Sequence, residues 1–114
     1  MSSCLKRGVS HLLAGIAVLA VLAPAVPAAP ADPAKGQDVY RTLKCAMCHK
    51  INGSGGKLGP DLSEVGAKRD ADWLMRYLMS PKALIPKAKM PPVKATDEDM
   101  KALVAYLQTL KTGK

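Results

Sequence analysis

The pentapeptide CAMCH, residues 45–49, places two thiols and an imidazole close enough together to hold one object. This spacing is compatible with a disulfide, a zinc ion, a redox-active dithiol or a haem attached through both cysteines. The chain has 114 residues, which predicts one small domain with limited apolar surface to bury. In a domain of that size, the object held by the motif largely determines which folds are stable.

The first 31 residues have the features of a secretory signal peptide. Lys6 and Arg7 precede an uncharged apolar run at 12–23, and several prolines follow it. This run matches the core of a signal peptide, about 7–15 residues, and falls short of the roughly 20 that a membrane-spanning helix needs. An uncleaved membrane anchor is the alternative interpretation.

Cleavage after this segment would leave residues 32–114 as the mature domain. Ala29-Pro30-Ala31 fits the small-x-small pattern of a cleavage site, and residues 26–28 offer a second one. We therefore expect a periplasmic protein that keeps no membrane span after cleavage.

The mature domain would contain few groups able to bind a metal. Its only cysteines are Cys45 and Cys48, and its only histidine is His49. A structural zinc site needs four ligands, usually Cys and His, and three are present. A redox dithiol is typical of a βαβ setting, and no segment of this chain shows the alternation of a strand.

A haem would use all three residues. The thiols of Cys45 and Cys48 are spaced to form thioethers with the two vinyl groups of one haem, and His49 can ligate its iron. Attachment of this kind takes place outside the cytoplasm, which agrees with the export signal. One covalent haem c, with His49 as proximal ligand, is therefore the predicted cofactor.

The second face of the iron needs another ligand in a haem protein that carries electrons, and Met or His supplies it. No second histidine remains after cleavage. Met90 is the candidate because it lies in a loop without periodicity, where Pro91 and Pro92 stiffen the backbone after it. The alternative is that Met90 only fills a gap in the core. The other methionines lie in the attachment turn or on predicted helix faces: Met47, Met75, Met79 and Met100.

Three stretches have the apolar spacing and end signals of helices. Each follows an Asp or Thr able to cap its first turn. Two Gly- or Pro-rich segments indicate long loops, which are unusual in a small domain unless a ligand holds them. The sequence thus predicts an all-α fold, with three main helices and two long loops wrapped around one haem. The predicted helices are 33–44, 71–79 and 97–111, and the loops are 51–62 and 80–95.

Nearly all of residues 33–112 resembles the small bacterial class I cytochromes c. The segments that carry the resemblance occur in the family's order: GQDVYRTLKCAMCH, LGPDLSEVGAKR, WLMRYL, KMPPV and LVAYLQTL. The resemblance implies the small cytochrome c fold, covalent haem on Cys45 and Cys48, and ligation of the iron by His49 and Met90.

The resemblance also implies roles for residues around the haem. The carbonyl of Pro60 would accept a hydrogen bond from the His49 imidazole, which fixes the ring and tunes the iron. Arg69 and Trp73 would contact the haem propionates, although a surface role for Arg69 and a core role for Trp73 are equally compatible. Contacts between the first and last helices are implied through Gly36, Tyr40, Leu103, Tyr106 and Leu107.

Two protein ligands on the iron predict a one-electron carrier rather than an enzyme, because no position is left for a substrate. No nucleophile–base pair is available in residues 32–114 either, since their only histidine would be on the iron and neither thiol would be free. We expect a periplasmic shuttle between redox partners of a respiratory or other oxidative chain. Two alternatives stay open: a haem c subunit of a larger periplasmic oxidoreductase, or a haem protein with an open sixth site for gas or peroxide.

The charge balance bears on the partners. Loss of Lys6 and Arg7 leaves 15 basic residues against nine acidic ones, a net charge of +6. Lys87, Lys89 and Lys94 surround Met90 in the sequence, so we expect redox protein partners with an acidic docking face. The alternative is that these lysines only keep the surface solvated. We expect a monomer that binds no nucleic acid.

Overall fold

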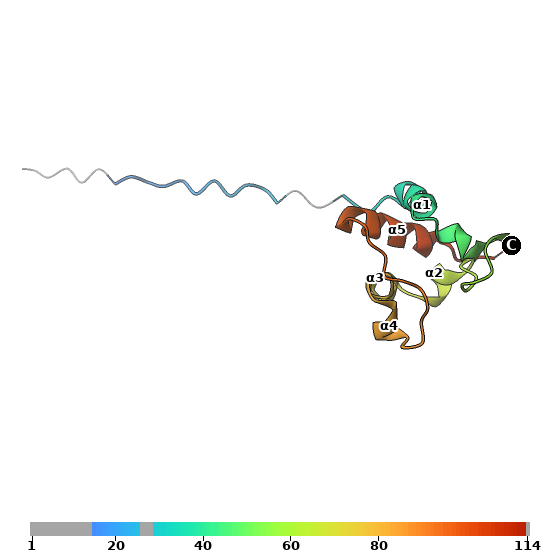
Figure 1. Cartoon of the computed structure of the whole chain (residues 1–114). Coiled ribbons are helices and arrows are strands. Elements are labelled where there is room, and N and C mark those ends of the chain that lie inside the picture. Colours follow the sequence, from blue (N-terminus) through green and yellow to red (C-terminus); the bar gives the residue numbers. More distant parts are fainter. Residues whose placement is uncertain (1–14, 26–28, 114) are drawn as a thin grey trace, which may run out of the picture.

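The computed structural model describes residues 15–25 and 29–113 (Figure 1). Residues 1–14 and the second candidate cleavage site at 26–28 lie outside the described residues, so the signal peptide stays a prediction. Residues 15–25 have no regular secondary structure. From residue 33 the elements are, in order, α1 (Pro33–Thr42), the 3-10 turn η1 (Cys45–Met47), β1 (Lys50–Ile51), β2 (Ser54–Gly55), α2 (Val65–Lys68), α3 (Ala71–Met79), α4 (Pro81–Leu84) and α5 (Asp97–Thr109).

The three longest helices are those predicted, and each begins at its expected cap. The Asp32 carboxylate accepts from the Ala34 amide at 2.8 Å, and the Asp70 carboxylate accepts from the Trp73 amide at 2.7 Å. Thr96 caps α5 through its side chain. These caps satisfy amides that have no partner within the helix. The helical content confirms the all-α prediction.

Helices α1 and α5 end two residues earlier than predicted. After α1, Lys44 takes a left-handed backbone conformation, with φ at 57°, and turns the chain into η1. Cys45 is the first residue of η1, so the attachment motif begins directly after this turn.

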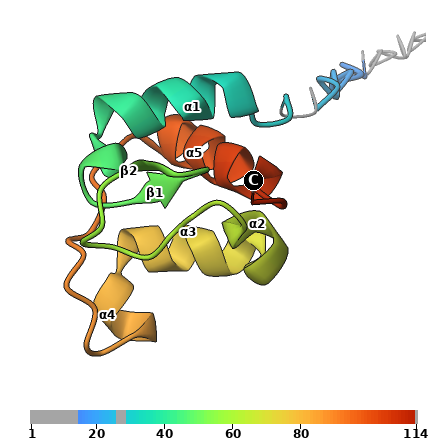
Figure 2. The same ribbon diagram turned by 90° about the vertical axis from the view of Figure 1, so that its right-hand side faces the viewer.

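Helix α1 packs against α5, as the resemblance implied (Figure 2). A Cβ atom on Gly36 would lie 1.9 Å from the carbonyl oxygen of Ala102, so only glycine permits this approach. One turn later the rings of Tyr40 and Tyr106 meet edge to face, with centroids 5.7 Å apart. Lys35 adds an ion pair to Glu98 at the exposed rim of the contact.

The buried core lies where α5 meets α1 and α3. Its most enclosed side chain is Leu103, 1% exposed, and Met100 is 5% exposed, as its place on a predicted apolar face required. Met79 does not follow that prediction, since it is 61% exposed. It is the last residue of α3, and Ser80 after it is exposed as well, whereas the next residue, Pro81, is fully buried. The other core residues are Tyr40, Leu74, Leu78, Val104 and Leu107.

The two predicted loops contain short elements that the sequence pattern did not indicate. Strands β1 and β2 pair antiparallel through Lys50–Gly55 and Ile51–Ser54, with Asn52 and Gly53 in the turn. Two-residue strands are too short to show alternation, and the single turn α4 in the second loop is too short to show helical periodicity. The same holds for α2, which lies between the first loop and α3. Among the described residues, no helix is long and apolar enough to cross a membrane.

Candidate cofactor site

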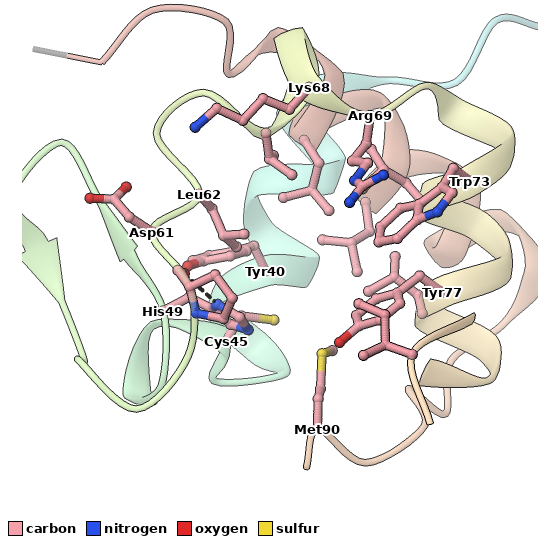
Figure 3. A pocket seen from close by; sticks show the side chains of 17 residues that line it. Tyr40, Cys45, His49, Asp61, Leu62, Lys68, Arg69, Trp73, Tyr77 and Met90 are labelled. Atoms are coloured by element: carbon pink, nitrogen blue, oxygen red, sulfur yellow. Dashed lines mark hydrogen bonds between the residues drawn. The ribbon is translucent and has the colours of Figure 1, made fainter. Parts of the chain in front are cut away.

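An apolar cavity of about 280 Å³ opens between the CAMCH segment on one side and α3 with the loop after α4 on the other (Figure 3). Cys45, His49 and Pro60 lie on the first wall. Trp73, Tyr77 and Met90 lie on the second. Leucines from α3 and α5 form the floor: Leu74, Leu78, Leu103 and Leu107. The cavity therefore unites most of the residues that the sequence singled out.

The imidazole of His49 is held by its neighbour on the same wall of the cavity. Its Nδ1 lies 2.9 Å from the carbonyl oxygen of Pro60, so Nδ1 carries the proton and donates it (Figure 3). The Nε2 lone pair is then left free to bind a metal. Gly59 makes this approach possible, because a Cβ there would lie 2.6 Å from the imidazole Cε1 atom.

The two cysteines lie differently. Cys45 is half-buried and lines the cavity, whereas Cys48 is exposed beside it. Burial raises the pKa of the Cys45 thiol, because the thiolate loses solvation there. No disulfide joins the two thiols, so both can form thioethers. A zinc ion would need further ligands, and the part of the chain that the structure describes holds no group of three His, Cys, Asp or Glu side chains able to bind one.

Met90 is the methionine that faces His49 across the cavity. Figure 3 shows its sulfur on the side of the cavity opposite the imidazole. Of the five methionines among the described residues, it is the one that lines the cavity. The amide of Val93 donates to the carbonyl of Leu78 at 2.8 Å and so ties the Met90 loop to the end of α3.

Arg69 and Trp73 lie together at the edge of the cavity. The guanidinium carbon of Arg69 is 4.1 Å from the centroid of the Trp73 ring, close enough for a cation–π contact. The Trp73 ring stacks in turn on Tyr77, with centroids 4.8 Å apart and planes 8° apart. The sequence did not single out Tyr77 as a site residue, although its i, i+4 spacing from Trp73 predicts the contact.

The cavity wall fits a large and mostly apolar cofactor. Packed protein interiors hold few voids larger than a water molecule, so an apolar cavity of this size is expected to be filled. Tyr40 lies in the wall, and its hydroxyl is the one buried side-chain polar atom without a partner among the described residues. Loss of solvation raises the pKa of Tyr40 to about 12, so the hydroxyl stays neutral.

Comparisons with known proteins place the chain in a family. Residues 33–111 match the sequence model of the cytochrome c family, and the chain belongs to that family. Cytochrome c from Ulva intestinalis is 36% identical over 78 residues, covering 50% of this chain and 69% of the relative. Cytochrome c oxidase subunit 2 from Alkalihalophilus pseudofirmus is 29% identical over 86 residues, covering 68% of this chain. This chain covers only 25% of that oxidase subunit.

Two solved structures share the fold. SoxXA from P. pantotrophus aligns with a TM-score of 0.64 at 21% identity, over 75% of this chain and 85% of that one. The c-type cytochrome SorU from Sinorhizobium meliloti aligns with a TM-score of 0.55 at 26% identity, over 72% of this chain and 95% of that one. These likenesses confirm the small cytochrome c fold.

Family membership and the CAMCH spacing together establish the cofactor. The chain is an electron-transfer haem protein whose haem c is attached covalently through Cys45 and Cys48. Its class, a small class I cytochrome c, agrees with the all-α fold and with the resemblance that the sequence carried.

Proposed function

We propose that this chain is a periplasmic one-electron carrier whose single haem c is ligated by His49 and Met90. In this role it passes electrons between redox partners of a respiratory or other oxidative chain. The observation that carries the proposal is the placement of His49 and Met90 on opposite walls of one apolar cavity. The same pair leaves no open position for a substrate, so we propose no enzymatic activity.

Each residue has a separate task. When bound, haem supplies an iron that gains or loses one electron. Cys45 and Cys48 fix the cofactor in place, and Pro60 orients His49 through the 2.9 Å hydrogen bond. Met90 would supply the second protein ligand, and methionine ligation favours a higher reduction potential than a second histidine would. The apolar walls would keep water away from the bound group.

Arg69 and Trp73 would bind the propionates at the cavity edge. The Arg69 guanidinium and the Trp73 indole offer N–H donors that suit carboxylates. Their cation–π contact holds the two groups together at that edge.

A redox titration followed by the haem absorption bands tests the proposed function. We expect a single one-electron wave at a positive potential, unchanged by candidate small-molecule substrates. A wave that needs more than one electron per chain, or turnover of an added substrate, would contradict a simple carrier.

The alternative is a haem c subunit of a larger oxidoreductase. It is favoured by the match of 68% of this chain to a relative named as an oxidase subunit. The native size of the protein, isolated without detergent from its own cell, separates the two. A monomer supports the carrier, and stable co-purification with a larger redox enzyme supports the subunit.

Export should remove the N-terminal segment. The basic start and the apolar run at 12–23 motivate this prediction. N-terminal sequencing of protein from the periplasm should begin at or near Asp32. Recovery only from membranes, with residues 12–23 still attached, would indicate an anchored cytochrome instead.

The lysines beside Met90 should steer an acidic partner. Lys87, Lys89 and Lys94 are exposed on the loop that presents Met90. Exposed charges of this kind accelerate the encounter with an oppositely charged partner, but salt screens the attraction beyond about 8–10 Å at moderate ionic strength. Electron transfer to an acidic partner should therefore slow as ionic strength rises.

Substitution tests the same prediction at the residue level. The double change Lys87→Gln with Lys89→Gln should slow the reaction at low salt and flatten its salt dependence. Lys111→Gln removes the same kind of charge from an exposed site after α5 and serves as the control. A rate that is independent of salt in the unmodified protein would mean that these lysines only solubilise the surface.

A further inference from the structure

The loop that carries Pro60 is fastened to the CAMCH segment by a ladder of hydrogen bonds. Residues 59–63 run alongside residues 48–52, and each rung joins one residue of the first segment to one of the second. The rungs are Gly59 N to Cys48 O at 2.7 Å, His49 Nδ1 to Pro60 O at 2.9 Å, Leu62 N to Lys50 O at 2.8 Å, and Asn52 N to Ser63 Oγ at 2.8 Å.

The last rung depends on a buried serine. Ser63 is 8% exposed and is the one buried polar residue of the described part of the chain. Its hydroxyl accepts from the Asn52 amide and donates to the Asp61 carboxylate, which also accepts from the Ser63 amide at 2.8 Å. The two hydrogen bonds from Ser63, one from its hydroxyl and one from its amide, lower the pKa of Asp61 below its ordinary 3.8. The carboxylate therefore stays ionised near neutral pH.

The position of the Pro60 carbonyl depends on its neighbours. Proline has no N–H, so the Pro60 backbone contributes only its carbonyl to the ladder and cannot donate a rung of its own. Gly59 holds the carbonyl from one side through a backbone hydrogen bond, and Leu62 with Ser63 hold it from the other. Apart from the His49 rung itself, the Ser63 rung is the only one made by a side chain. It is therefore the support that a substitution can remove.

We propose that Ser63, braced by Asp61, is a positioning residue that holds the Pro60 carbonyl on the imidazole N–H of His49. The proposal rests on the proposed function, in which His49 ligates the iron. A histidine ligand that donates a strong hydrogen bond from its other nitrogen is a stronger base toward the metal. Ser63 thus helps to keep the reduction potential lower than His49 and Met90 alone would set it.

Removal of the Ser63 hydroxyl provides the test, made on the holoprotein. In Ser63→Ala, the Pro60 loop loses its last rung, so the His49 Nδ1 proton should exchange faster with D₂O. Proton NMR of the ferrous protein measures that exchange. The reduction potential should rise in the same variant, because a weaker hydrogen bond makes His49 less basic.

Two further variants keep the test decisive. Asp61→Ala changes an exposed residue that also lines the cavity, so its lost charge raises the potential by itself, and the exchange of the His49 proton is its informative readout. That exchange should become faster by a smaller amount than in Ser63→Ala. Ser54→Ala removes an exposed hydroxyl from β2 of the same hairpin and should change neither readout.

The same NMR spectrum separates failure of this proposal from failure of the proposed function. If His49 ligates the iron, the haem ring current shifts its ring protons strongly upfield. Shifted His49 protons, with unchanged exchange in Ser63→Ala and Asp61→Ala and an unchanged potential in Ser63→Ala, would overturn the positioning role. A lower melting temperature alone would do the same, since it reports only packing. Unshifted His49 protons in the unmodified protein would overturn the ligation itself, and the positioning role with it.

Discussion

Replacing both Cys45 and Cys48 by serine is expected to abolish covalent attachment of haem. Hydroxyl groups do not form the thioethers that the thiols make with the vinyl groups, and residues 32–114 contain no other cysteine. Each single change, Cys45→Ser or Cys48→Ser, leaves one thioether and should only weaken attachment. Haem staining of a denaturing gel measures the covalent fraction directly.

The double variant should also lose its stable fold. The walls of the 280 Å³ cavity are apolar, and without the cofactor they face a void or water. Far-ultraviolet circular dichroism should show less helix than in the holoprotein. Extraction of the haem from the unmodified protein by acidified acetone would contradict covalent attachment.

Replacing Met90 by alanine is expected to open the iron. Met90 is the cavity-lining methionine of the described chain, and Pro91 and Pro92 stiffen the loop that presents it. Met90→Ala should lose the weak charge-transfer band of ferric Met–haem ligation, lower the reduction potential and let carbon monoxide bind the ferrous protein. It should also destabilise the fold, because the bond to iron pins the 80–95 loop to the cofactor.

Two other methionines provide matched controls. Met79 is 61% exposed, so Met79→Ala should leave both the band and the stability nearly unchanged. Met100 is buried, so Met100→Ala should keep the band while costing about 2–5 kcal/mol of unfolding free energy. If Met90→Ala keeps the band and Met75→Ala or Met100→Ala loses it, Met90 is the wrong ligand.

The main helices and the attachment motif could be predicted because their signals are local. Each main helix follows a residue whose side chain accepts a hydrogen bond from a backbone amide no more than three residues later. These capping residues are Asp32, Asp70 and Thr96. Haem attachment could be predicted from the spacing of the CAMCH motif and from the lack of further cysteine or histidine ligands in residues 32–114. The long loops could be assigned to a cofactor, because a small domain seldom leaves such segments without support.

Features that depend on long-range contacts could not be predicted in the same way. Ser63 and Asn52 meet through the fold, and nothing in either sequence neighbourhood indicates the other. The exposure of Met79 depends on where α3 ends relative to the core. Its i, i+4 spacing from Met75 therefore wrongly predicted a buried side chain. The unpaired hydroxyl of Tyr40 likewise becomes visible only once the cavity wall is built.

Carbon monoxide titration of the unmodified ferrous protein at neutral pH is the most direct test of whether His49 and Met90 both ligate the iron. His49 and Met90 lie on opposite walls of the cavity, and the proposal is that they occupy both axial positions. We expect no binding of carbon monoxide, because His49 and Met90 together would leave the iron no open position. Rapid, stoichiometric binding would contradict it and would indicate an open site for gas or peroxide instead.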